Sequence, residues 1–295
     1  MPIRLAENFR AVFYAPFYAA QALGFYRREG IDVEMISSSV PGNAVNSLLA
    51  GAIDITWGGP MRVMKAHDRD SNSPLICFCE VVGRDPFYLV GKRDPAVFKL
   101  GDLQGLRFAA VSEVPTPWMC LQHDLRERGI DPDRLHRAAD RPMTENLAAL
   151  HAGELDVAQL FEPYVSMALK EGAGVLYAGA ARGPTVYTTF ITTHQAIERH
   201  RMAFAGIARA LAGTLEWITA HRTDKLAEVT GPFFPGVPRS ILANALERYR
   251  QDGVWTGGSE VSPQGFARLA ASLLSGAFIS RLPRYEDCVT ETMDR

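Results

Sequence analysis

Residues 50–55 read Ala-Gly-Ala-Ile-Asp-Ile, and residues 152–157, 102 positions later, read Ala-Gly-Glu-Leu-Asp-Val. Both hexamers follow a short segment with helical spacing, and a Gly at the end of such a segment typically terminates the helix. The apolar–Asp–apolar triplet after it is typical of a short buried strand. Further upstream, the Gly-Ile-Asp of residues 30–32 recurs at residues 129–131. The sequence therefore predicts two copies of one α/β unit.

Each unit predicts the same order of elements: strand, loop, helix, strand, helix and strand. The first strand and helix fall at Ile3–Glu7 and Pro16–Glu29 in the first unit, and at Arg107–Val111 and Trp118–Arg128 in the second. Helices that alternate with short strands indicate a mainly parallel sheet with helices on both faces. The predicted fold class is therefore α/β, with two similar Rossmann-like lobes joined by a hinge.

The chain is expected to cross between the lobes near Phe87–Val90 and Tyr187–Ile191, where extended apolar segments lie beside Pro or Gly. This gives a discontinuous lobe 1, residues 1–87 plus 191–295, and a lobe 2, residues 88–190, with a ligand cleft between them. The C-terminal third has helical spacing, and we expect its helices to pack around lobe 1. These helices are predicted at Ala203–Ala220, Ser240–Gln251 and Pro263–Ser275.

Charge and composition exclude several classes of partner. The chain has 31 basic and 33 acidic residues and a net charge of −2, so no basic surface for nucleic acid is expected. No apolar run approaches the roughly 20 residues that cross a bilayer, which argues against membrane insertion. No apolar leader segment precedes the first strand. We therefore expect a periplasmic protein if a signal peptide has been removed, and a cytoplasmic protein otherwise.

The cysteines and histidines show no pattern of a metal or disulfide protein. Cys77, Cys79, Cys120 and Cys288 include no Cys-x-x-Cys pair, so a disulfide framework is not expected. The seven histidines form no His-x-x-x-His pair and no cluster with cysteine. No Walker or Gly-x-Gly-x-x-Gly loop for nucleotide phosphates occurs. The sequence therefore predicts no metal site and no cofactor.

Four segments together resemble one family of transport proteins. They are residues 15–35 (APFYAAQALGFYRREGIDVEM), 48–59 (LLAGAIDITWGG), 103–131 (LQGLRFAAVSEVPTPWMCLQHDLRERGID) and 147–164 (LAALHAGELDVAQLFEPY). In this order and spacing they resemble the ABC-transporter solute-binding proteins of the nitrate/sulfonate/taurine/thiamine-precursor type. The resemblance covers essentially the whole chain. It implies a type II periplasmic-binding-protein-like fold, a small organic ligand captured between two hinged lobes, and an ABC permease as partner.

Ligands in open α/β sheets bind beyond the carboxyl ends of the strands, so the loops there hold the candidate binding residues. In the first lobe, two aromatic residues follow the first strand, and a Trp-Gly-Gly run follows the first repeat. Its glycines let backbone N–H groups approach a ligand, whereas Trp57 is either a cleft wall or lobe packing. Arg62 is either the partner of an anionic ligand or a solvated cation. The first-lobe candidates are Phe13, Tyr14, Trp57, Gly58, Gly59 and Arg62.

The second lobe and the crossings supply the remaining candidates. Thr116 lies near a predicted helix start and can donate a hydrogen bond. Glu162 follows the second repeat and is either a cleft residue or a surface carboxylate. Arg84 is either a ligand contact or half of a hinge salt bridge. The candidates in this group are Arg84, Glu113, Thr116, Glu162 and Tyr187.

The same residues indicate the chemistry of the ligand. Glu113, at the predicted entrance of a helix, would repel a sulfonate or nitrate at that point. Aromatic walls with carboxylates and few unambiguous cations therefore favour a planar, hydrogen-bonding, heterocyclic ligand over a small anion.

An enzyme built on the same fold is the alternative function. Thiamine-pyrimidine synthases of the superfamily carry a pyridoxal-phosphate lysine and a donor histidine just after the strand of the first repeat, where this chain has Gly58 and Arg62. A desulfinase- or decarboxylase-like enzyme acting on a small aromatic substrate stays open, with Lys65, His67 or Cys120 as its chemical groups. We assign no catalytic residue and expect a binding protein.

Overall fold

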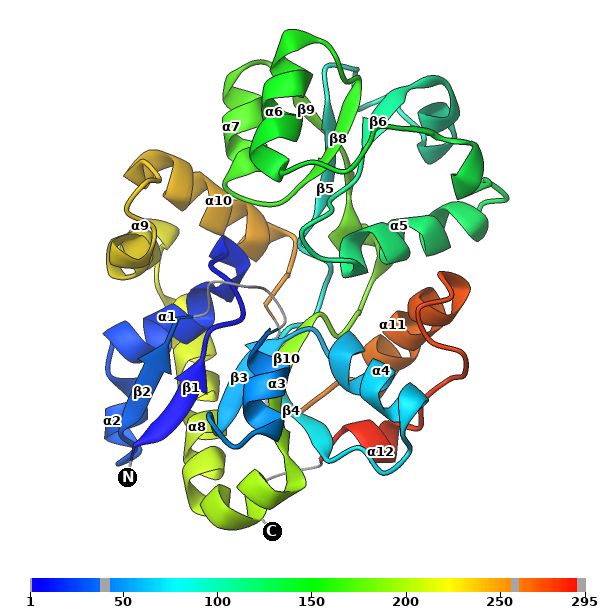
Figure 1. Cartoon of the computed structure of the whole chain (residues 1–295). Helices are drawn as coiled ribbons and strands as arrows, with labels where there is room; N and C mark the ends of the chain where they lie inside the picture. The colour runs from blue at the N-terminus through cyan, green and yellow to red at the C-terminus, as the bar shows by residue number, and fades with distance from the viewer. Residues whose placement is uncertain (1, 38–42, 256–259, 291–295) are drawn as a thin grey trace.

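The strands of the computed structural model form two five-stranded sheets among the residues that it describes, which are 2–37, 43–255 and 260–290 (Figure 1). The first sheet has the order β2-β1-β3-β10-β4, and the second has the order β7-β6-β8-β5-β9. The first-sheet strands are β1 (Ile3–Ala6), β2 (Val33–Ile36), β3 (Ile55–Gly58), β4 (Leu75–Val82) and β10 (Thr188–Thr193). The second-sheet strands are β5 (Tyr88–Gly91), β6 (Arg107–Ala109), β7 (His136–Arg137), β8 (Val157–Leu160) and β9 (Gly174–Ala178).

The two sheets share one plan, which confirms the predicted pair of similar α/β lobes. β1 pairs in parallel with β2 and β3, and β6 pairs in parallel with β7 and β8. The fourth strand of each sheet, β10 or β5, is antiparallel to both of its neighbours. Each sheet is therefore mainly parallel, as predicted, with one antiparallel strand that enters it from a hinge crossing.

Helices cover the sheets as the alternating pattern predicts, with one break. The predicted helix Pro16–Glu29 is two helices, because Gly24 between them has a φ of 73°. In the first lobe the helices are α1 (Ala15–Ala22), α2 (Phe25–Arg28), α3 (Asn43–Leu49) and α4 (Met61–Arg69), and in the second α5 (Thr116–Arg126), α6 (Met143–Ala152) and α7 (Tyr164–Lys170). The C-terminal helices are α8 (His194–Ala220), α9 (Thr223–Thr230), α10 (Arg239–Gln251), α11 (Pro263–Ser275) and α12 (Tyr285–Cys288). Short 3-10 turns are η1 (Val12–Tyr14), η2 (Leu100–Gly105), η3 (Pro132–Arg134), η4 (Gly179–Arg182) and η5 (Gly231–Phe233). No helix in the described part of the chain is both long and apolar enough to span a membrane.

The repeated Ala-Gly-x-x-Asp motif builds the same ion pair in each lobe. Asp54 accepts hydrogen bonds from the backbone N and the guanidinium of Arg4, at 2.8 to 3.0 Å. Asp156 accepts the same three bonds from Arg107, also at 2.8 to 3.0 Å. In both copies the arginine lies on the neighbouring strand, β1 or β6. The repeated aspartate therefore anchors the start of one strand to the next.

The chain crosses between the lobes through two adjacent extended segments, residues 83–87 and 183–187. They are bonded to each other, because Thr185 N donates to Gly83 O at 2.9 Å and Tyr187 N donates to Val82 O at 2.8 Å. The predicted boundary between residues 190 and 191 falls inside β10, so the change of sheet comes before Thr188. The crossing segment and the buried strand that follows it have the same apolar composition, so the sequence does not show where one ends and the other begins.

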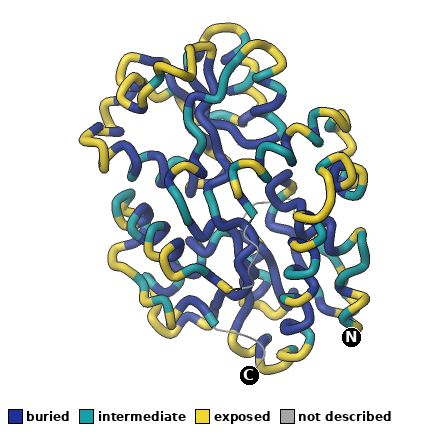
Figure 2. Tube along the Cα trace, turned by 180° about the vertical axis from the view of Figure 1, so that it is seen from behind, coloured by how far each residue is buried: buried dark blue, intermediate teal, exposed yellow. Residues whose placement is uncertain are grey.

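The C-terminal helices do not pack around the first lobe alone. Among them, α11 lies against α5 of the second lobe as well as α4 of the first. Arg126 donates to Ser275 O at 2.9 Å, and Arg182 donates to Ser272 Oγ at 2.7 Å. Seen from behind, buried residues run through both sheets and the crossings (Figure 2). The second lobe is therefore a further partner of the C-terminal helices, which helical spacing does not reveal, because it shows an apolar face without showing what the face covers.

Candidate ligand-binding site

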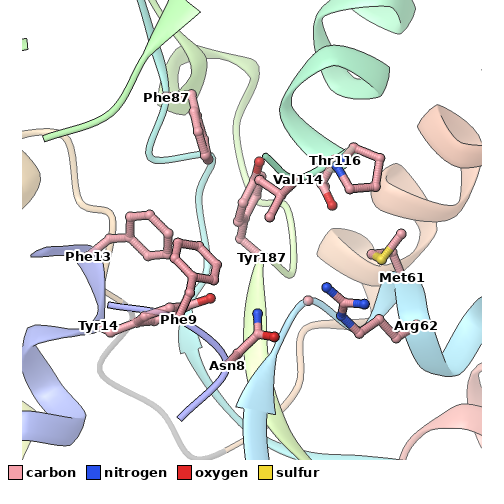
Figure 3. Close-up of a pocket in the computed structure, with 12 residues that line it drawn as sticks. Asn8, Phe9, Phe13, Tyr14, Met61, Arg62, Phe87, Val114, Thr116 and Tyr187 are labelled. Carbon is pink, nitrogen blue, oxygen red and sulfur yellow. The ribbon is translucent and has the colours of Figure 1, made fainter. Parts of the chain in front are cut away.

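A pocket lies where the two lobes and both crossings meet, and its empty space of about 370 Å³ includes solvent at its open side. Four structural regions contribute to it: the loop after β1, the start of α4, the start of α5 and the crossings. Figure 3 shows aromatic rings on one side and polar groups with Met61 on the other. The lining residues are Asn8, Phe9, Phe13, Tyr14, Gly59, Met61, Arg62, Phe87, Val114, Pro115, Thr116 and Tyr187.

The aromatic side of the pocket is a connected set of rings from the first lobe and the two crossings. The Phe13 ring centroid lies 5.9 Å from that of Phe9 and 6.0 Å from that of Phe87. Phe87 in turn lies 5.8 Å from Tyr187, which belongs to the other crossing. Such a wall offers a large apolar surface to the body of a ligand.

Arg62 brings a half-buried cation to the opposite side of the pocket. Its side chain extends toward the cavity in Figure 3. Burial lowers the pKa of this guanidinium, and the described neighbour that raises it is the phenol of Tyr14, with no carboxylate contributing. A buried cation without a carboxylate partner favours an anion beside it.

Two helices start at the pocket, one from each lobe. Met61 begins α4 and Thr116 begins α5, and both residues line the cavity. Neither preceding proline, Pro60 or Pro115, provides a side-chain cap for the first N–H groups. A Cβ added at Gly59 would lie 3.9 Å from Thr116 Oγ1, which shows how closely the lobes approach here. Two uncapped helix starts add partial positive charge to that of Arg62.

Two phenols complete the polar set. Burial raises the pKa of Tyr14 to about 12, while a hydrogen bond with the Asn8 side chain acts in the opposite direction. The Tyr187 hydroxyl is buried and has no hydrogen-bond partner among the described residues. Burial raises the pKa of Tyr187 well above its ordinary value, so the group is a neutral donor. An unpaired buried hydroxyl is costly unless a ligand or water completes it.

Of the sequence-predicted residues, the cavity brings together Phe13, Tyr14, Gly59, Arg62, Thr116 and Tyr187. Trp57 and Gly58 lie in β3 instead of the loop after it, because the strand starts at Ile55 and ends three residues beyond the repeat, at Gly58. Trp57 is fully buried and stacks on Phe17 at 4.5 Å. The prediction that Trp57 faces a ligand is therefore corrected to a core role. Gly58 packs beside the amide of Asn8.

The three remaining candidates lie outside the cavity lining. Glu113 turns toward α6, where its Oε1 accepts a hydrogen bond from Met143 N at 2.6 Å. The predicted repulsion of an anion by Glu113 therefore fails, because the carboxylate caps another helix. Arg84 donates to Ala180 O at 3.4 Å along the crossing. Glu162 is completely buried and pairs with Arg248, so it is neither a ligand contact nor a surface carboxylate.

Sequence reasoning missed six lining residues, Asn8, Phe9, Met61, Phe87, Val114 and Pro115. Each of them lies within five positions of a correctly placed residue, or on a predicted crossing. The signal that could have found them is the rule that whole loops at strand ends, and not single residues, face the ligand.

Comparison with known proteins agrees with this geometry. The model of the family described as NMT1/THI5 like matches residues 12–224. The chain belongs to the NMT1/THI5-like family. The "Putative binding protein YtlA" of Bacillus subtilis strain 168 is 25% identical over 252 residues, which cover 84% of this chain and 75% of that protein.

Solved structures share the fold of this NMT1/THI5-like chain at low sequence identity. The periplasmic aliphatic sulphonate binding protein SsuA from Escherichia coli has a TM-score of 0.79 and 14% identity, over 98% of this chain and 92% of that one. The Candida albicans CA3427 product, described as having the generic periplasmic binding protein structural fold, has a TM-score of 0.71 and 12% identity, over 99% and 97%. The predicted periplasmic-binding-protein-like fold is thereby confirmed.

The side chains that the alternative enzyme function would use in this NMT1/THI5-like chain, Lys65, His67 and Cys120, do not line the pocket. Lys65 pairs with Asp68 at 3.0 Å, and His67 Nε2 lies 2.9 Å from Leu75 O. Cys120 is buried, and burial raises the pKa of its thiol to about 12, so it is not a thiolate. Within the described ranges, no three His, Cys, Asp or Glu residues cluster to hold a metal ion. The pocket groups themselves are suited to holding a ligand by hydrogen bonds and charge.

Proposed function

We propose that this chain is the solute-binding component of an ABC-type import system and that it binds a small organic anion between its lobes. The observation that carries the choice of an anion is Arg62, a half-buried cation directed into the pocket with no carboxylate among its described neighbours. This proposal revises the expectation of a planar, hydrogen-bonding heterocycle in preference to a small anion, since Glu113 turns toward α6.

The two sides of the pocket suit two parts of one ligand. An anionic head group beside Arg62 would accept charge-assisted hydrogen bonds there and from the first N–H groups of α4 and α5. A planar or apolar body would lie against Phe9, Phe13 and Phe87. The Tyr187 hydroxyl would donate to a polar atom between them. The proposed ligand therefore retains the planar body that the sequence analysis expects, because such a body would lie against the aromatic wall.

Binding between the lobes also gives a signal for transport. A ligand that touches both lobes stabilises their closed arrangement by its difference in affinity for closed and open forms. A permease that recognises the closed arrangement would then receive loaded protein selectively. By analogy with the SsuA protein, we place this protein in the periplasm, with an ABC permease as its partner.

The test is a binding screen that separates charge from shape. Alkyl and aryl sulfonates, aryl carboxylates and neutral planar heterocycles are compared by thermal shift and calorimetry, and bound ligand is recovered by mass spectrometry. We expect organic anions to bind and to be recovered unchanged. Arg62→Gln should weaken their binding by tenfold or more, because a hydrogen bond to a charged group contributes about 1.5–3 kcal/mol.

Two variants serve as controls. Arg27→Gln removes an exposed cation from α2 and should leave binding unchanged. Gly59→Val adds a branched side chain at the pocket, and its Cβ alone would lie 3.3 Å from Met61 Cγ. The variant should therefore abolish binding of every ligand, whatever the charge of the ligand. Stabilisation by neutral heterocycles alone, or full binding by Arg62→Gln, would refute the anionic ligand. A ligand converted on incubation would make the protein an enzyme.

A further inference from the structure

Helix α10 lies between the two lobes although its chain comes from the C-terminal third. In Figure 1 it sits below α7 of the second lobe and above the start of the first lobe. It contacts α7, α9 and the turn η1. Because η1 carries Phe13 and Tyr14, one helix touches both the second lobe and the back of the pocket wall.

The centre of the contact with the second lobe is the buried carboxylate of Glu162. Its Oε1 accepts hydrogen bonds from Arg248 Nε at 2.8 Å and from Ser166 Oγ at 2.9 Å, and its Oε2 accepts one from Ser166 N at 2.9 Å. The backbone N of Glu162 donates to the Tyr249 hydroxyl at 2.9 Å. Two consecutive residues of α10 therefore hold one residue of the second lobe.

A second contact follows at the end of α10. The Tyr88 hydroxyl in β5 donates to Asp252 Oδ2 at 2.6 Å, and the Tyr88 ring stacks on that of Tyr249 at 6.2 Å. Directly afterwards, the chain is fixed to the pocket wall and the hinge. Trp255 Nε1 donates to Phe13 O at 2.9 Å, and Gly83 N donates to Val254 O at 3.0 Å.

Glu162, the residue that α10 holds, is next to an aromatic ring that packs against the pocket wall. Phe161, which precedes Glu162, has its ring centroid 5.5 Å from Phe13 and 6.4 Å from Phe9. Both of these first-lobe rings line the cavity. Movement of Glu162 away from α10 would therefore carry Phe161 away from the aromatic side of the pocket.

The energetics of this contact suit a device that opens. Burial raises the pKa of Glu162, although Arg248 and Ser166 act in the opposite direction. A buried ion pair of this kind adds little net stability, but loss of one partner is costly because it leaves the other charge buried alone. The intact pair therefore holds the joined arrangement only weakly and can open, whereas removal of Arg248 leaves the Glu162 carboxylate buried without its cation and disfavours that arrangement.

We propose that Glu162 and Arg248 are positioning residues of an interlobe latch, which holds Phe161 against the aromatic wall of the pocket and must open for ligand to enter or leave. The latch touches no lining group directly, so it governs the rate of ligand exchange through the lobe arrangement. This inference rests on the proposed function for its kinetic consequence, whereas its effect on the lobes can be measured in the protein alone.

The first measurement needs no ligand. Spin labels at Leu49→Cys and Val97→Cys, exposed positions in the first and second lobes, report the distance between the lobes, and the four native cysteines are buried. We expect Arg248→Met to shift the distance distribution to longer values, and Arg248→Lys to restore it in part. Unchanged distances in Arg248→Met would overturn the latch, since α10 and the second lobe would then move as one body.

The second measurement is stopped-flow binding of 4-toluenesulfonate as a probe. Arg248→Met should raise both the association and the dissociation rate about tenfold, whereas a merely structural role would lower thermal stability without changing the rates. The matched control is Arg107→Met, which breaks an equally short arginine–aspartate pair at 2.8 Å inside the second lobe. Absence of 4-toluenesulfonate binding in the unmodified protein would count against the anionic ligand, and the label distances would still decide the latch.

Discussion

At the scale of single residues, the buried acid of the hinge is Asp85. It lies on the first crossing, is 3% exposed, and accepts a hydrogen bond from Phe87 N at 3.0 Å. Burial raises the pKa of Asp85 to about 7, although Arg182 nearby acts in the opposite direction. The ionisable groups around it are Arg182, Asp124, Cys120, Tyr177 and Tyr187. A carboxylate in this position opposes folding whenever it is charged.

The sign of the resulting pH dependence follows from that direction. The pKa of Asp85 is raised from 3.8 to about 7 by folding. The stability that the protonated side chain gives to the folded state is therefore fully present below pH 3.8, and it is lost as the pH rises through 7. Asp85→Asn removes the titration, so its stability relative to the unmodified protein should improve by on the order of 4 kcal/mol between these limits. Urea unfolding from pH 4.5 to 8 measures the difference.

An exposed carboxylate provides the control. Asp32→Asn, in the loop before β2, should show no such rise in relative stability. A constant difference between Asp85→Asn and the unmodified protein across this range would mean that Asp85 is charged throughout.

Side-chain direction is what the sequence predicted least well at this scale. Phe13 and Tyr14 do line the pocket, because they follow a strand whose end is clear from its pattern. Trp57 was misplaced because its strand runs three residues beyond the repeat. Glu113 lies in the predicted loop, but it accepts a hydrogen bond from Met143 N at the start of α6 instead of facing the ligand. Met143 is thirty positions away, so no local pattern indicates this contact.

At the scale of elements, the duplicated ion pair should differ in strength between the lobes. The side chain of Asp54 is 6% exposed and also lies 3.6 Å from His200, whereas that of Asp156 is 32% exposed. Solvent screens the second pair more strongly. Asp54→Asn should therefore cost about 1–3 kcal/mol of unfolding free energy, and Asp156→Asn less than about 1 kcal/mol. Equal costs in urea unfolding would contradict this ranking.

The same motif explains why the elements could be predicted. A helix end, a short strand and an anchoring aspartate recur in one order, and each has a local cause in Gly51 or Gly153 and in Asp54 or Asp156. The antiparallel strands β5 and β10 could not be read in this way. Their direction depends on where the chain enters each sheet, which no local pattern records.

At the scale of the whole molecule, the contacts between the lobes should make them unfold together. Helix α10 holds the second lobe through Glu162, and α11 holds it through Arg126 and Arg182. One apolar cluster also continues from the first sheet through Phe13 and Phe161 into the second lobe. These ties oppose independent unfolding of the second lobe, although its covalent links to the first lobe, residues 83–87 and 183–187, are two short segments. We therefore expect a single cooperative transition.

Trp118 makes this expectation measurable, because it lies in the second lobe and packs on Phe108 at 5.7 Å. In a variant that keeps Trp118 and replaces Trp57, Trp217 and Trp255 by Phe, fluorescence reports that lobe while far-ultraviolet circular dichroism reports the whole chain. Coincident urea midpoints indicate coupled lobes. If the Trp118 signal changes at lower urea than the dichroism, the second lobe unfolds first, and the contacts of α10 and α11 are then too weak to join the lobes into one cooperative unit.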